Sequence, residues 1–280
     1  MKLKLQIDML LSIIAIILVA SLAPAAEGQP QLVAFTSVPP IAYCIERIGE
    51  GRVQVYSMIS PSDDPHTFEP KPKQMASLSK AGIYFSTDFP FERVILPKIK
   101  SSNPNLAVVD VGYGLPGYGN EQDPHIWTSP LAMLKIADNV YRGIISADPK
   151  GAEAYRKNFQ DFLGDIVALD IKIWDTLKDV RGKKFVVFHP SWGRFAKDYG
   201  LTQVPIEVEG KEPKGADLAR LIEAAKAEGV KAIFVSPQHS KKGAKAVADA
   251  IGARLIEIDP LSKDWANNLL SVANTFARVL

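Results

Sequence analysis

The 280-residue sequence is poor in cysteine and histidine, and neither sign of charge is in large excess. Its single cysteine, Cys44, cannot form an intramolecular disulfide. Cys44 shares helical spacing with Ile41, Ile45 and Ile48, which predicts a place in the core rather than a reactive thiol. The formal net charge of +2 gives no strong attraction to nucleic acid or to an anionic membrane. We therefore expect no nucleic-acid partner.

Long apolar runs are also scarce, apart from the run at residues 9–20. Lys2 and Lys4 precede this run, and the small-residue segment Ala23-Pro24-Ala25 follows it. This order is typical of a secretory signal peptide, and the run is shorter than the ~20 residues of a membrane span. We expect a signal peptide at residues 1–25, cleaved near Ala25. Because no cysteine lies near that point, we expect an exported, periplasmic protein without a lipid anchor.

Apolar runs typical of buried strands alternate with helical patterns in the rest of the chain. The predicted strands cover residues 32–37, 53–59, 82–87, 106–111, 184–189, 203–209, 231–236 and 253–259. The predicted helices include residues 41–49, 73–81, 91–100, 192–199, 216–228 and 242–251. This alternation predicts an α/β fold with mainly parallel sheets flanked by helices. We expect two such lobes, at residues 26–147 and 181–280.

A long amphipathic segment, residues 148–180, separates the two predicted lobes. Asp148 suits a helix N-cap, and Pro149 suits the first helical position. Apolar residues recur at steps of three and four, at Tyr155, Phe159, Phe162, Ile166, Leu169, Ile173 and Leu177. About 30 residues of helix would span roughly 45 Å at 1.5 Å per residue. We therefore expect one long, rigid backbone helix that joins the lobes.

The segment Gly112–Gly117 matches the GxGxxG pattern but does not predict a nucleotide site. A dinucleotide site needs a helix that opens directly from the glycine turn. Here Pro116 and the sequence GYGNEQDP follow instead, which indicates a flexible loop.

Three of the four histidines and one aspartate follow predicted strands. His66 and His125 each occur in the tripeptide Asp-Pro-His, whereas His189 and Asp259 end the strands at 184–189 and 253–259. Ligands in open α/β sheets bind beyond the carboxyl ends of the strands. If the two lobes face each other across those ends, the four side chains can converge on a metal ion.

Several neighbouring residues have alternative roles. Asp64 and Asp123 precede proline, which favours a turn role over orientation of a histidine. Glu69 is either a hydrogen-bond acceptor for a ligand or a helix-start residue. His239 follows another strand and could be a fifth participant, although the lysines at 241 and 242 disfavour a cation there.

Three imidazoles and one carboxylate form a nitrogen-rich ligand set. This set suits Zn²⁺ in a four-coordinate shell at ~2.0–2.2 Å, whereas Mn²⁺ prefers more oxygen ligands. Because the ligands bind deprotonated, we expect the zinc affinity to fall as the pH drops through ~6.5.

Five ordered motifs resemble the metal-binding solute receptors of ABC transporters, above all the zinc-uptake (ZnuA-type) branch. These motifs are DPHTFEP, DPHIW, FHPSWGRFAKDYG, KAIFVSPQHS and GARLIEIDPL. The resemblance implies two α/β lobes joined by one long helix, with the metal in the cleft between them. It places the metal ligands at His66, His125, His189 and Asp259, and histidine at 189 indicates zinc rather than manganese. It also implies a monomer that delivers its ion to a membrane permease with a cytoplasmic ATPase.

Three positions depart from the family pattern. Ser129 stands in the second motif where an aspartate is usual, and Ser236 stands where a glutamate is usual. Both changes remove a carboxylate that could orient a ligand. The glycine-rich segment 112–122 replaces the histidine-rich loop of many zinc receptors, so metal scavenging by this loop is not indicated.

Four alternatives remain open. A receptor of the same type could prefer manganese or iron. An exported zinc-dependent hydrolase would need an open coordination position, which Asp259 would fill, and the sequence contains no HExxH pair. A receptor for a metal chelate would not need converging histidines. Export also permits a surface adhesin, although no motif indicates one.

Overall fold

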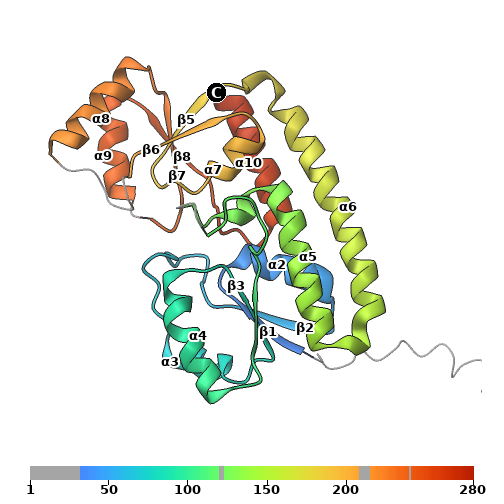
Figure 1. Ribbon diagram of the computed structural model, residues 1–280. Coiled ribbons are helices and arrows are strands. Elements are labelled where there is room, and N and C mark those ends of the chain that lie inside the picture. The colour runs from blue at the N-terminus through green and yellow to red at the C-terminus, as the bar shows by residue number, and fades with distance from the viewer. Residues whose placement is uncertain (1–31, 120–122, 208–214, 240) are drawn as a thin grey trace, which may run out of the picture.

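We describe the protein from a computed structural model, in which residues 32–119, 123–207, 215–239 and 241–280 are described. The predicted signal peptide at residues 1–25 lies outside these residues. The described chain forms two parallel four-stranded sheets, one in each half, with helices on both sides (Figure 1). The predicted α/β fold is confirmed.

The N-terminal sheet has the strand order β2-β1-β3-β4. Its strands are β1 (Leu32–Thr36), β2 (Val53–Ser57), β3 (Ile83–Ser86) and β4 (Ala107–Asp110). The helices of this lobe are α2 (Pro39–Gly49), α3 (Pro72–Leu78), α4 (Pro90–Ser102) and α5 (Pro130–Ala147). All four residues of β3 are buried, as expected for a central strand that is covered on both faces. The buried Cys44 belongs to the apolar face of α2, in agreement with its predicted core position.

The C-terminal sheet repeats this topology with the order β6-β5-β7-β8. Its strands are β5 (Lys184–Val187), β6 (Thr202–Pro205), β7 (Ala232–Val235) and β8 (Arg254–Glu257). The helices of this half are α7 (Gly193–Asp198), α8 (Ala216–Ala227), α9 (Lys241–Ile251) and α10 (Trp265–Val279). Because every paired strand is parallel, the carboxyl ends of each sheet lie on one edge.

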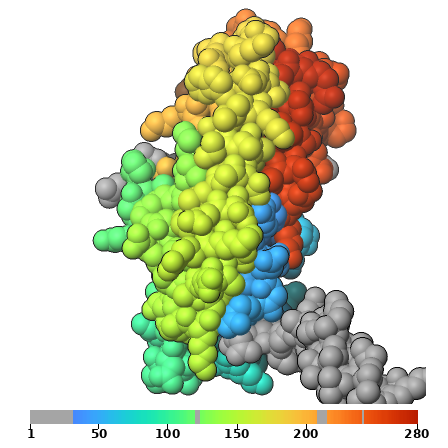
Figure 2. Space-filling view, turned by 90° about the vertical axis from the view of Figure 1, so that its right-hand side faces the viewer, coloured from blue at the N-terminus to red at the C-terminus, as the bar shows by residue number. Residues whose placement is uncertain are grey.

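The long helix α6 (Ala152–Thr176) runs along both lobes, as Figures 1 and 2 show. Short 3₁₀ turns precede and follow it, at Pro149–Gly151 and Lys178–Val180. Its predicted apolar face is buried at Tyr155, Phe162, Ile166, Leu169 and Ile173. One continuous core includes this face together with side chains of both lobes, so α6 packs against the lobes rather than serving as a free linker.

Two tryptophans link the lobes close to the predicted site. Trp127 donates its indole N–H to the Pro260 carbonyl at 2.7 Å, and Trp265 donates to the Trp127 carbonyl at 2.7 Å. Trp127 and Trp265 are almost completely buried. These paired bonds fix the segment after His125 against the segment after Asp259.

The structure adds two helices to the predicted set and forms no helix at the glycine-rich loop. The predicted helices do not include α5 or α10, although both are amphipathic and pack in the core. Residues 112–119 form turns, in agreement with the rejection of a nucleotide site. None of the helices in the described ranges has both the length and the hydropathy that a membrane span requires.

Candidate metal centre

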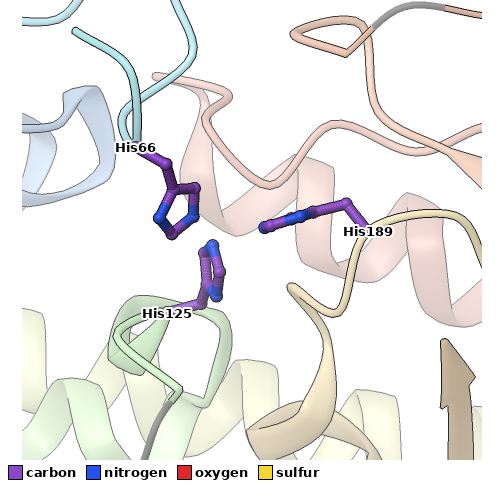
Figure 3. Close-up of side chains that lie close together, drawn as sticks. All are labelled: His66, His125 and His189. Atoms are coloured by element: carbon purple, nitrogen blue, oxygen red, sulfur yellow. The ribbon is translucent and has the colours of Figure 1, made fainter. Parts of the chain in front are cut away.

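Three of the predicted ligands converge where the two lobes meet (Figure 3). His66 lies in the loop after β2, His125 precedes the 3₁₀ turn Ile126–Thr128, and His189 follows β5. The ring centroids are 5.4 Å apart for His66 and His125, 4.9 Å for His66 and His189, and 5.3 Å for His125 and His189. One ring nitrogen from each histidine lies within 4.8 Å of the others. This spacing suits three nitrogen ligands on one ion.

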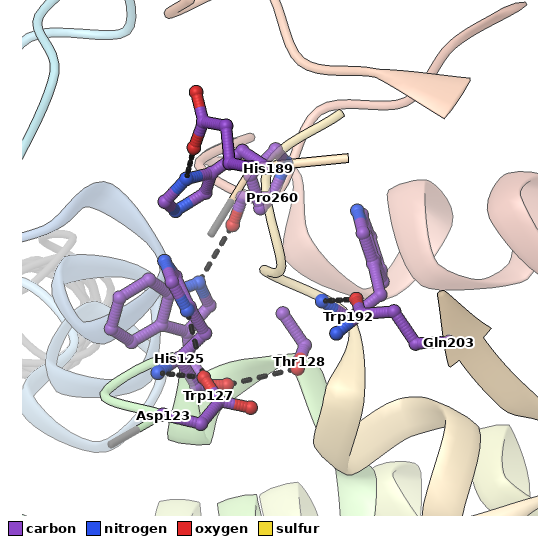
Figure 4. A network of polar contacts seen from close by, with 9 residues as sticks. Asp123, His125, Trp127, Thr128, His189, Trp192, Gln203 and Pro260 are labelled. Carbon is purple, nitrogen blue, oxygen red and sulfur yellow. Dashed lines mark hydrogen bonds and ion pairs between the residues drawn. The ribbon is translucent and has the colours of Figure 1, made fainter. Parts of the chain in front are cut away.

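Two of the three imidazoles contact a carboxylate, and Asp123 orients the first of them, that of His125 (Figure 4). Its Oδ1 accepts a hydrogen bond from the His125 backbone N–H at 3.0 Å and lies 2.8 Å from Nδ1 of the His125 ring. The turn role favoured from the sequence and the orienting role are therefore combined in one oxygen. Burial alone would raise the pKa of Asp123, but the hydrogen bonds and charge of His125 lower it below its usual value.

Glu207 orients the second imidazole, a role that no sequence pattern predicts. Its Oε2 lies 2.7 Å from Nδ1 of His189, and both side chains are buried. A ring that donates through Nδ1 directs its other nitrogen away from the carboxylate and fixes the tautomer. Nε2 of His189 is buried and has no hydrogen-bond partner among the described residues. That nitrogen is a candidate metal ligand.

The third imidazole, His66, lies among rings rather than against a carboxylate. Its ring lies 5.6 Å from that of Phe89, in an edge arrangement. Asp64 instead accepts from the His66 backbone N–H at 2.9 Å and from the Thr67 hydroxyl at 3.2 Å, which is the predicted turn role. Although His66 as a residue is exposed, desolvation of its ring among the neighbouring histidines, and then repulsion from His125 and His189, lowers the pKa of His66 from 6.5 to about 3. Glu69 is exposed in the same loop, ahead of α3.

The fourth predicted ligand, Asp259, adjoins the histidines but is not in their group. Its Oδ1 accepts from Nε2 of Gln238 at 2.8 Å and from the Leu261 backbone N–H at 2.8 Å. The next two residues, Pro260 and Leu261, line the same pocket as the three histidines. The role of Asp259 as fourth ligand stays a prediction.

His239 lies closer to the site than its lysine neighbours in the sequence indicated. Its ring stacks on that of His189, with centroids 4.3 Å apart and planes inclined by 29°. It also lines the pocket, together with Gln238. Burial, followed by the charge of His189, lowers the pKa of His239 despite the carboxylates of Asp64 and Glu207.

The two serines that depart from the family pattern have different surroundings. Ser129 accepts from the Ala132 backbone N–H at 2.9 Å, which caps α5, and donates to Asp198 of the other lobe at 2.5 Å. Oγ of Ser236 is buried without a hydrogen-bond partner among the described residues. The carboxylates that contact the clustered imidazoles therefore come from other positions, Asp123 and Glu207.

The fold and the paired orientation of the imidazoles define a two-lobe, metal-binding receptor. A family model described as "Zinc-uptake complex component A periplasmic" matches residues 34–279, and the chain belongs to this family. The resemblance noted in the sequence is thus confirmed.

Individual relatives agree with the family assignment. The high-affinity zinc uptake system protein ZnuA of Bacillus subtilis is 31% identical over 252 residues, which cover 82% of this chain and 79% of that protein. The zinc-binding lipoprotein AdcA of Streptococcus pneumoniae is 28% identical over 276 residues, which cover 90% of this chain but only 54% of the relative. The chain therefore spans about half the length of that second relative.

Solved structures of similar proteins show the same architecture. A crystal structure of ZnuA superposes with a TM-score of 0.83 and 37% identity, covering 89% of this chain and 98% of that one. A zinc-bound deletion mutant of ZnuA gives a TM-score of 0.82 and 38% identity, covering 89% and 97%. The predicted arrangement of two lobes joined by a long helix is confirmed by this match.

Proposed function

We propose that this chain is an extracytoplasmic receptor that captures Zn²⁺ and delivers it to the membrane permease of an ABC importer. The observation that carries the proposal is the buried Nε2 of His189, which has no hydrogen-bond partner among the described residues and belongs to a group of three imidazoles. Leaving a buried polar atom unsatisfied costs about 1–3 kcal/mol. A bound cation would supply the missing partner.

The proposed ligands are His66, His125, His189 and Asp259. Two of the imidazoles are oriented through Nδ1 by carboxylates, which raises the basicity of the nitrogen that would bind the ion. Asp259 would supply the fourth ligand through a carboxylate oxygen. Three nitrogens and one oxygen favour Zn²⁺ over Mn²⁺, which is better served by oxygen ligands.

The pocket favours capture of a bare ion over catalysis or chelate binding. Its cavity measures ≈ 10 Å³, about the space that one water molecule requires. Pro65, Pro260 and Leu261 form part of its wall. A hydrolase would need room for a substrate beside the metal and an open coordination position. We therefore propose a transport receptor without catalytic activity.

The proposal includes export and partners. The family name refers to a periplasmic component of a zinc-uptake complex, which supports a site outside the cytoplasm. We propose that the chain is exported through the segment at residues 1–25, is released near Ala25, and acts as a monomer. Its partners would be a permease and a cytoplasmic ATPase. The relative from Streptococcus pneumoniae is named a lipoprotein, so mass spectrometry of the mature N-terminus would distinguish release from lipid attachment.

Competitive titration tests the proposal directly. Metal-free mature protein would be titrated with Zn²⁺ and with Mn²⁺ against a chromophoric chelator. We expect one tight zinc site, with manganese at least about a hundredfold weaker. Equal affinities would contradict the three-imidazole site. No tight binding of either ion would contradict the metal-receptor proposal itself.

A further inference from the structure

His189 belongs to a second cluster of metal-ligating side chains besides the three-histidine group. Ligand atoms of His189, Glu207 and His239 also lie within 4.8 Å of one another. His189 and Glu207 are buried, and the side chain of His239 is only 15% exposed. Two imidazoles and one carboxylate are the kinds of ligand that bind Zn²⁺ in proteins.

Carboxylates and oxygen atoms surround the second cluster. Nδ1 of His239 lies 3.9 Å from Oδ2 of Asp64, and Glu207 provides a second carboxylate. The loop that carries His239 also holds two buried oxygens without hydrogen-bond partners in the described part of the chain, Oγ of Ser236 and Oε1 of Gln238. Unpaired oxygens and carboxylates beside two imidazoles favour a cation.

The two clusters cannot both be filled through His189. A neutral imidazole has one protonated nitrogen and one nitrogen with a free lone pair, so it binds one ion at a time. We propose that His189, Glu207 and His239 form a second Zn²⁺-binding position, which alternates with the position at His66, His125 and His189. This inference rests on the proposed function, because it assigns the second position to the same ion.

An alternating position would ease exchange of the ion. Zn²⁺ that moves between the two clusters keeps His189 as a ligand or close neighbour throughout, so only part of its ligand set is exchanged in that step. His239 and Gln238 line the pocket that the three histidines line, so His239 of the second cluster shares a cavity with the first. The second position would therefore serve loading or release.

A crossed set of variants tests the second position. The starting variant is His66→Ala, which removes a ligand of the first position and none of the second. His239→Phe, which keeps a planar ring, and His125→Ala are each added to it. Competitive titration with Zn²⁺ then gives the residual affinity of all three proteins, and wild-type protein is titrated in parallel. If His239→Phe prevents folding, His239→Ala replaces it, with circular dichroism as the check.

The expected result is a residual zinc affinity in His66→Ala that depends on His239. Adding the His239 substitution should weaken it by about tenfold or more, and adding His125→Ala should change it by less than about threefold. The reverse pattern, or no measurable residual binding, would overturn the second position. A wild-type protein without a tight zinc site would instead overturn the proposed function.

Discussion

Substitution of Asp123 can test whether this residue orients the His125 ring or only shapes the turn that carries it. Oδ1 of Asp123 accepts from the His125 backbone N–H and from Nδ1–H of its ring, which is 5% exposed. Oδ1 of Asp64 accepts from the His66 backbone N–H in the same Asp-Pro-His sequence, but the carboxylate has no hydrogen bond to the His66 ring in the described structure. The two aspartates therefore form a matched pair that differs in the ring contact.

The expected losses follow from this contact. Asp123→Asn keeps an oxygen for the turn and replaces a charge-assisted hydrogen bond of about 1.5–3 kcal/mol with a neutral one of about 0.5–1.5 kcal/mol. The difference of about 1–1.5 kcal/mol corresponds to a roughly five- to thirteenfold weaker zinc affinity. Asp123→Ala leaves the ring without an acceptor, and we expect a loss of about 10- to 100-fold. Asp64→Asn removes a nearby charge but no contact with the His66 ring, so we expect a smaller loss than for Asp123→Asn.

Competitive zinc titration of the three variants measures these losses, with thermal unfolding as a check on the turn. Both asparagine variants retain an acceptor for the turn, so their melting temperatures should be similar. Equal losses of affinity at the two positions would refute the assignment of Asp123 as an orienting residue. Equal losses would indicate that both aspartates act only through the geometry of the loop.

Four other outcomes are expected. Alanine at any one of the three clustered histidines should weaken zinc binding by about a hundredfold or more in the same titration. Asp259→Ala should weaken zinc binding and reduce the preference over Mn²⁺, whereas unchanged titrations with both ions would remove Asp259 from the ligand set. In Gly193→Ala, the added Cβ would lie 2.8 Å from Oδ2 of Asp123 and displace the carboxylate. We therefore expect zinc binding to weaken about tenfold. An unchanged affinity would show that the carboxylate can move without loss. The pKa of His66 is lowered from 6.5 to about 3 in the folded protein. As the pH falls below 6.5, the His66 ring therefore takes up a proton in the unfolded chain before it does so in the folded one. The metal-free protein should lose stability over this pH range. Urea unfolding at several pH values measures this loss, and the same slope in His66→Ala would contradict its assignment to this ring.

The convergence of the three histidines could be predicted from the sequence because it depends on topology. His66, His125 and His189 each follow a strand, and parallel strands place their carboxyl ends on one edge. The apolar period of residues 148–180 likewise predicted α6, with its ends a few residues shorter than expected. Patterns of this kind depend on backbone geometry that every strand or helix shares.

The carboxylate partners could not be predicted in the same way. Glu207 follows β6, and many other acidic residues in the sequence have similar neighbouring residues. Its contact with His189 depends on the pairing of β5 with β6, which places the two strand ends side by side. The sequence favoured a turn role for Asp123 because the Asp-Pro pattern is the same as at Asp64. Only the tertiary position of each ring decides whether the carboxylate also reaches it.

The serines at 129 and 236 replace carboxylates of the family pattern, and another residue supplies the charge beside His189. The orienting charge on His189 comes from Glu207, which holds Nδ1 at 2.7 Å. Ser129 uses its hydroxyl to cap α5 and to bind Asp198 across the lobes, so this position now contributes to the contact between lobes. A neutral Ser236 beside His239 also leaves the second cluster with fewer negative charges than a glutamate would give. The proposed second position would therefore hold Zn²⁺ less tightly than it would with a glutamate at 236.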